Sequence, residues 1–156
     1  MRIYCSEIID SLIYLGTLGG ITVLKDNAVL KSWTTSNSKL PANWITSLLK
    51  KDKDLYIGTY GGGVAKIGGD GNFLDFKMRF EVNPNAFCYI EPFLLVGTLD
   101  NGIFLYHTIS NKWYNIKNGL GSLNVTSIID GGEYIYIGAE CGLIKMPKNE
   151  LERYGA

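Results

Sequence analysis

The sequence contains few of the residues on which metal sites and disulfide frameworks usually depend. It has 3 cysteines and 1 histidine in 156 residues. Cys5, Cys88 and Cys141 form no CxxC spacing, and an odd number of cysteines does not complete a disulfide framework. We expect each of them to be a small apolar residue of a strand. No cysteine or carboxylate stands at metal-ligand spacing from His107, so we expect neither a metal nor a cofactor.

Excess charge and long hydrophobic runs are also absent. The 15 basic and 15 acidic side chains cancel, which leaves no electrostatic signature of nucleic-acid or anionic-membrane binding. No stretch is apolar enough to span a bilayer, and the first residues do not resemble a signal peptide. We therefore expect a cytoplasmic protein if the chain is complete. If it was cut from a longer secreted chain, the expected location is periplasmic or extracellular.

Catalytic and nucleotide-binding motifs are missing as well. The glycine-rich stretch "LYIGTYGGG" (55–63) resembles a phosphate-binding loop, but such a loop must lead into a helix. Here a short apolar segment follows and then Gly68-Gly69-Asp70-Gly71, which cannot begin one. No nucleophile elbow, HExxH pair or dinucleotide fingerprint occurs, so we assign no catalytic residue.

What the chain does contain is a phrase that occurs four times. The copies are "LIYLGTLGGITVL", "LYIGTYGGGVAKI", "FLLVGTLDNGIFLY" and "YIYIGAECGLIKM". Their central glycines, Gly16, Gly58, Gly97 and Gly138, are 42, 39 and 41 residues apart. A period of about 40–45 residues with four strands per unit is typical of β-propeller blades. We predict an all-β chain of four four-stranded antiparallel blades, at about residues 1–38, 39–82, 83–119 and 120–156.

Each unit divides into the same four strands. The first strand reads "WITSLL" from Trp44 and "NVTSII" from Asn124, with looser versions from Tyr4 and Asn85. The second strand ends in the repeated glycine, which is expected to allow close backbone approach at a crowded position. The threonine after it becomes Ala139 in the last unit, so we give that hydroxyl a structural role. A polar turn and a fourth strand follow, each strand with an aromatic residue: Trp33, Phe76, Trp113 and Tyr154. The last of these sixteen strands is expected to be short or frayed.

The repeats resemble those of the two-component-regulator propeller family. The segment "NWITSLLKKDKDLYIGTYGGGVAKI" (43–67) is similar to its N-x-I-x-x-I strand, tryptophan-I-G-T strand and G-G-G-L strand, and "NVTSIIDGGEYIYIGAECGLIKM" (124–146) is nearly as similar. Tyr56 and Tyr136 stand at the usual tryptophan position. The resemblance implies a propeller of the kind found in the sensory part of bacterial signalling proteins, where it binds ligands or mediates contacts. It implies no catalytic residues.

Candidate binding residues come from the geometry of a meander, whose loops alternate between two faces. The connections entering each first strand and those joining second to third strands share one face, near the propeller axis. Aligning the units places eight residues there: Tyr4, Trp44, Tyr60, Asn85, Asp100, Asn101, Asn124 and Glu140. Aromatic rings beside amides and carboxylates suit a saccharide or a peptide. Equally, Trp44 could pack against the next blade while the asparagines serve turns.

Two questions stay open at this stage. A non-enzymatic binding or protein-interaction module of the sensory type is favoured, because the fold alone does not specify a function and the sequence offers only scattered catalytic candidates. The alternative is a carbohydrate-active lyase or hydrolase that uses scattered carboxylates such as Asp100 and Glu140. The ring could close with four blades, or two copies could join head to tail into eight. An open arc is not expected, because it would expose blade-sized apolar faces. Of the two closed rings we favour the homodimer, because the repeats resemble those of larger rings, in which the angle between blades is shallow.

Overall fold

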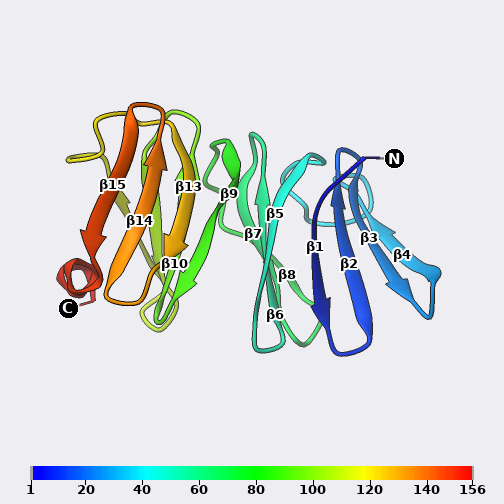
Figure 1. Ribbon diagram of the computed structural model, residues 1–156. Helices are drawn as coiled ribbons and strands as arrows, with labels where there is room; N and C mark the ends of the chain where they lie inside the picture. The colour runs from blue at the N-terminus through cyan, green and yellow to red at the C-terminus, as the bar shows by residue number, and fades with distance from the viewer. Residues whose placement is uncertain (1, 156) are drawn as a thin grey trace. The chain divides into compact units, whose positions relative to one another are not determined.

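The computed structural model describes residues 2–155, which form 15 strands and one 3-10 helix. The strands make four sheets, and within each sheet the strands lie in sequence order as a meander (Figure 1). The first sheet contains β1 (Ile3–Ile9), β2 (Leu12–Thr17), β3 (Gly20–Lys25) and β4 (Ala28–Trp33), and the second contains β5 (Ile45–Lys51), β6 (Asp54–Thr59), β7 (Gly63–Ile67) and β8 (Phe73–Asp75). The third contains β9 (Val82–Ile90), β10 (Phe93–Thr98), β11 (Ile103–His107) and β12 (Lys112–Ile116), and the fourth β13 (Val125–Asp130), β14 (Tyr134–Ala139) and β15 (Gly142–Pro147). The predicted all-β fold of four blades is confirmed.

The fourth blade departs from the prediction at its outer edge. The strand expected around Tyr154 is absent, and a 3-10 helix, η1 (Lys148–Tyr154), follows β15 instead. Pro147 ends the strand, because proline offers no N–H to continue the ladder. After it, the apolar residues Leu151 and Tyr154 are three positions apart, which is the period of a 3-10 helix and not of a strand.

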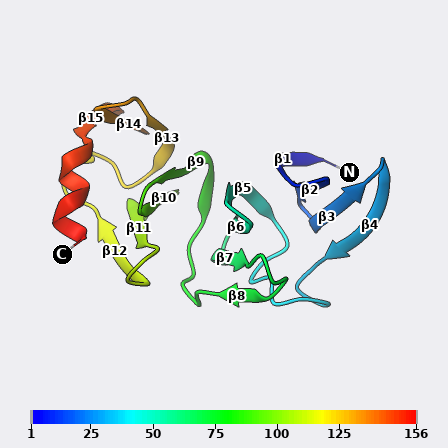
Figure 2. The same cartoon turned by 90° about the horizontal axis from the view of Figure 1, so that it is seen from below.

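The chain divides into two compact units, residues 1–82 with the first two blades and residues 83–156 with the last two. Each unit has its own core. In the first, Val23 of the first blade and Ile45 and Ile57 of the second are fully buried in one cluster. In the second, Leu95, Ile137 and Leu151 belong to the corresponding cluster. Seen from below in Figure 2, β5, β6, β7 and β8 follow one another across their blade in sequence order.

Turn chemistry follows the sequence closely. Asp10, Asp52 and Asn111 have positive φ at hairpin turns, and so do the consecutive Asp26 and Asn27. Aspartate and asparagine tolerate this left-handed backbone better than other non-glycine residues do. The polar residues therefore determine where each meander reverses.

The cysteines follow the expectation only in part. Cys5 and Cys88 are partly buried in strands, and burial raises the pKa of the Cys5 thiol to about 12. Cys141, in contrast, is exposed in the turn between β14 and β15, because the side chain of a turn residue is not covered by a neighbouring blade. Over residues 2–155 there is no helix of the length and apolarity that a membrane crossing requires.

Candidate functional site

The candidate site begins with a bulge that three blades share. In β1, β5 and β13 the register shifts by one residue near the start of the strand. The residues at this bulge are Tyr4, Thr46 and Thr126. Bulges re-aim side chains at the rims of sheets, and here the bulge turns the ring of Tyr4 toward the next blade.

The strand pairing shows that one of the predicted alignments is wrong. Ile3, Ile45 and Val125 pair with the last residues of β2, β6 and β14, so the residues before them are equivalent. Trp44 therefore corresponds to Arg2 and Asn124, and Tyr4 stands two positions further along its strand. The repeat length does not reveal the bulge, because β1, β5 and β13 carry it at the same distance from the repeated glycine.

Three of the predicted residues come together in the first unit. The ring centroids of Tyr4 and Trp44 are 5.9 Å apart, and those of Trp44 and Tyr60 are 4.4 Å apart with 32° between the ring planes. All three side chains are partly exposed. The guanidinium carbon of Arg2, a residue that was not predicted, lies 5.2 Å from the centroid of the Tyr4 ring. We call Arg2, Tyr4, Trp44 and Tyr60 the aromatic cluster.

Backbone contacts hold the aromatic cluster in place. The N–H of Tyr60 donates to the carbonyl of Trp44 at 2.9 Å, and Tyr60 also forms a β-bridge with Glu81. The indole Nε1 of Trp44 is buried and has no hydrogen-bond acceptor among residues 2–155. A buried indole N–H usually finds an acceptor, so the cluster combines a stacking surface with one unsatisfied donor.

In the second unit, Asn124 and Glu140 repeat the arrangement of Trp44 and Tyr60. The N–H of Glu140 donates to the carbonyl of Asn124 at 3.0 Å, as the N–H of Tyr60 does to Trp44. Asn83, which the sequence did not single out, donates from Nδ2 to Asn124 Oδ1 at 2.9 Å and to the Val125 carbonyl at 2.7 Å. No sequence signal reveals this contact, because the two asparagines belong to different blades.

The other predicted residues of the second unit mainly serve local structure. Asn101 donates from Nδ2 to the Asp100 carboxylate at 2.6 Å and from its backbone N–H to the Thr98 hydroxyl at 2.9 Å. Asn85 is exposed with a φ of 63° and lies inside β9, which begins at Val82. The predicted start of the third blade's first strand at Asn85 is therefore wrong, because the apolar Val82 already pairs in the sheet.

The threonines after the repeated glycines have the structural role that was predicted. Thr17, Thr59 and Thr98 each donate from Oγ1 to the carbonyl of the glycine that closes the next turn, at 2.8–2.9 Å. His107 is buried at the end of β11, where its Nδ1 accepts from the Ser110 N–H at 3.0 Å. Within the described part of the chain, no group of three or more His, Cys, Asp or Glu side chains could hold a metal ion.

Comparisons with known proteins identify the fold of the chain but do not assign it to a family. No protein-family model matches the chain, and no curated protein matches it. Among solved structures, the computationally designed protein Ika4 is similar over 94% of this chain and 91% of its own, with a TM-score of 0.74 and 18% identity. The WD40 β-propeller domain of Doa1 is similar over 99% of this chain and 53% of its own, with a TM-score of 0.72 and 11% identity.

Sensor domains also appear among the similar structures. The extracellular domain of BT4673 from B. thetaiotaomicron, named as a one-component system, is similar over 96% of this chain, with a TM-score of 0.81 and 18% identity. This chain spans only 21% of that domain's length. At these identities the likeness is one of fold, and it establishes that the four sheets of this chain are β-propeller blades.

Proposed function

We propose that this chain is a non-enzymatic binding or protein-interaction module of the sensory type. In this proposal it holds a saccharide or a peptide on the face that carries the strand 4–1 connections and the strand 2–3 turns. The observation that carries the proposal is the aromatic cluster, in which two residues predicted at strand starts, Tyr4 and Trp44, and one predicted on a turn, Tyr60, lie in ring contact. The similarity to extracellular sensor domains supports a binding role by analogy of fold alone.

The chemistry of the cluster suits a ligand with both apolar and polar surface. Trp44 and Tyr60 offer ring faces, on which the C–H face of a sugar or a peptide side chain can stack. In the second unit, Asn124 and Glu140 present an amide and a carboxylate at the positions equivalent to Trp44 and Tyr60. The proposed face therefore carries different side chains at equivalent positions of its blades, as a selective binding surface requires.

The test compares binding with stability in the same variants. A carbohydrate array and a peptide library, each screened for binding and for turnover, would identify ligands. With a ligand in hand, Trp44→Ala and Tyr60→Ala should each weaken binding by about tenfold or more, since truncated aromatic anchors typically cost that much. Asn124→Ala should weaken it less, because part of its amide already bonds to Asn83.

Two outcomes would contradict the proposal. Unchanged affinity in folded Trp44→Ala and Tyr60→Ala proteins would exclude the aromatic cluster as the site. A loss of stability in parallel with the loss of binding would instead mean that Trp44 packs the blades together. Leu18→Ala is the matched control, because Leu18 stands at the position of Tyr60 in the first blade and is half exposed. Turnover of a bound saccharide would favour the enzyme alternative.

We also propose that the chain pairs with a second copy to complete an eight-bladed ring. On the first blade, Ile8, Ile13, Leu24 and Val29 are aligned in one row across all four strands. Ile8 is 53% exposed and Val29 66% exposed. On the fourth blade, Ile129 and Leu143 lie on one face and are 60% and 72% exposed. Ile129 is in register with Tyr136 and Lys145, so the exposed surface of the fourth blade is less apolar than the row on the first blade. Exposed apolar side chains gathered on a sheet face favour a contact surface, and two unlike faces suit head-to-tail pairing.

A further inference from the structure

A second candidate site lies in the first unit, at the opposite end of β1 from the aromatic cluster. Tyr4 is near the start of β1, whereas Asp10 follows its end. Here the turns after β1, β5 and β7 surround a cavity of about 360 Å³ between the first and second blades. This volume is within the range of ligand-binding pockets, at its small end. None of the residues that line it was predicted as a binding residue.

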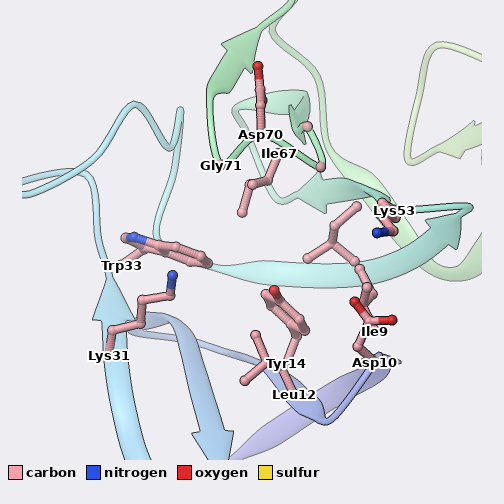
Figure 3. Close-up of a pocket in the computed structure, with 13 residues that line it drawn as sticks. Ile9, Asp10, Leu12, Tyr14, Lys31, Trp33, Lys53, Ile67, Asp70 and Gly71 are labelled. Atoms are coloured by element: carbon pink, nitrogen blue, oxygen red, sulfur yellow. The ribbon is translucent and has the colours of Figure 1, made fainter.

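Two aromatic side chains form one wall of the cavity. The ring centroids of Tyr14 and Trp33 are 6.3 Å apart, and their planes differ by 23°. Phe73 holds Trp33 from the other blade in an edge contact at 5.1 Å. Because Trp33 is clamped between these two rings, its indole is a fixed surface. Figure 3 shows Ile67 facing this wall from across the cavity.

Charged groups of both signs surround the aromatic wall. Figure 3 shows Lys31 beside Trp33, and Asp10 and Lys53 on the other side of Tyr14. The Lys31 ammonium lies 4.4 Å from the centroid of the Trp33 ring. Among residues 2–155, none of Asp10, Lys31 and Lys53 forms an ion pair, whereas the nearby Lys66 and Asp54 are paired at 3.4 Å. These three groups are therefore available to a ligand.

The hydroxyl of Tyr14 is a further polar group at the wall. Burial, and after it the negative charge of Asp10, raises the pKa of Tyr14. The hydroxyl therefore keeps its proton and can donate as well as accept. It points into the cavity between Trp33 and Asp10 in Figure 3.

The glycine turn that closes the cavity does not bind anions. The N–H of Gly68 donates to the Asn72 carbonyl, that of Gly69 to the Asp54 carboxylate and that of Gly71 to the Gly68 carbonyl, at 2.8–3.0 Å. An anion-binding loop requires such N–H groups to be free. The Asp10 carboxylate also repels an anion, while Lys31 and Lys53 repel a cation. A neutral ligand suits the balance of charges best.

We propose that this cavity binds a neutral pyranose residue of a saccharide. One face of the sugar ring, which consists of C–H groups, lies on the indole of Trp33. Asp10 accepts hydrogen bonds from ring hydroxyls, and Lys31 and Lys53 donate to hydroxyl oxygens. The site is separate from the aromatic cluster and does not depend on it.

The probes are the methyl glycosides of glucose, galactose and mannose, with inorganic phosphate as the anionic comparison. Binding is measured by saturation-transfer NMR and by calorimetry on the full chain. We expect millimolar affinity for at least one glycoside, because an open pocket of this size buries little ligand surface. Asp10→Asn and Lys31→Gln should each weaken binding by about tenfold, since each removes a charge-assisted hydrogen bond.

The controls match the variants in residue type and backbone. Asp26→Asn is the control for Asp10→Asn, because both aspartates are exposed turn residues with φ of 49° and 53°. Lys25→Gln is the control for Lys31→Gln on the same blade, and both controls should leave affinity unchanged. Trp33 also packs on Phe73, so Trp33→Ala would change the stability of the fold as well as the site. Asp10 and Lys31 are exposed, so the variants at these two positions decide the test.

Three results would overturn the proposal. The first is that no glycoside binds at millimolar concentration. The second is glycoside binding that survives Asp10→Asn and Lys31→Gln but is lost in Trp44→Ala, which would assign the sugar to the aromatic cluster. The third is phosphate binding that depends on Lys31 and exceeds that of every glycoside. If Trp44→Ala leaves glycoside binding unchanged while Asp10→Asn and Lys31→Gln weaken it, the cavity proposal stands. Only the function proposed for the aromatic cluster is then affected.

Discussion

At Gly16 the chain has no space for a methyl group. A Cβ atom built there would lie 2.7 Å from Ile45 of the next blade and closer still to the Cys5 sulfur. Gly58 and Gly97 are equally confined, since a Cβ would lie 2.8 Å from Val82 and from Val125 respectively. The glycine therefore allows one sheet to approach another in the first three repeats, whereas a Cβ at Gly138 would meet Ser127 and Thr126 of its own blade. All four positions are crowded, as was predicted.

We predict that Gly16→Ala destabilises the protein by about 1–3 kcal/mol, the usual cost of overpacking a filled core. Gly19→Ala is the matched control, because its Cβ would have 3.8 Å to the nearest atom, the Thr17 hydroxyl. Urea unfolding followed by circular dichroism measures both. Equal midpoints for the two variants would mean that the blades can move apart to accept the methyl group.

At the scale of single residues, the sequence indicated the turns better than the binding groups. Asp10, for example, is a polar residue of a hairpin turn, and its φ is 53°. The position of Asp10 near Lys53 could not be predicted, because the two residues belong to different blades and line one cavity only when the blades pack together. Similarly, Asn83 reaches Asn124 across 41 positions of sequence.

At the scale of elements, η1 closes the second unit where a fourth strand was expected. Leu151 is only 4% exposed and belongs to the core of that unit. The rings of Tyr154 and Tyr114 are 5.4 Å apart, so the helix also contacts β12. The helix therefore covers apolar surface of the second unit.

We predict that Leu151→Ala lowers the free energy of unfolding by about 2–5 kcal/mol, as is usual for a buried leucine truncated to alanine. Glu152→Ala serves as the control, because Glu152 is the exposed neighbour on the same helix. Thermal unfolding of both variants is the measurement. A change below about 0.5 kcal/mol in Leu151→Ala, the range of ordinary surface substitutions, would show that η1 does not hold the core.

The bulges show why element boundaries are harder to predict than element types. The repeat spacing and the turn residues identified the first strand of all four blades. Alternating apolar residues and glycine turns are local signals, so they can be recognised in the sequence. The single extra residue near the start of β1, β5 and β13 leaves the repeat length unchanged. The bulge was therefore invisible in the repeat length. Tyr4 lies 12 residues before Gly16, whereas Trp44 lies 14 residues before Gly58, and the strand pairing confirms that the two are not equivalent.

At the scale of the whole molecule, the proposed pairing rests on the apolar row of the first blade and on the exposed Ile129 and Leu143 of the fourth. We predict that light scattering gives twice the 17.3 kDa mass of one chain. Val29→Lys should shift the protein to the monomer, because it places a charge at the most exposed position measured in the apolar row, on the edge strand β4.

The control for the pairing experiment is Ile109→Lys. Ile109 is 76% exposed in the turn between β11 and β12, outside both rows, so the same substitution there should leave the mass unchanged. A wild-type protein that scatters only as a 17.3 kDa monomer at high concentration would exclude the homodimer. It would favour closure of the ring with four blades.

The sequence by itself determined that this protein is built from β-propeller blades and that it has four of them. Repeat length, alternation and turn residues act over short stretches of chain, so they could be recognised without knowing which segments touch. Only the tertiary structure decided the bulged starts of the blades, the helix in place of the last strand and the two groups of possible ligand-binding residues. Tyr4 meets Trp44, and Trp33 meets Phe73, across the space between blades. Such contacts depend on the packing of one sheet on another, which a repeat of 39–42 residues does not specify.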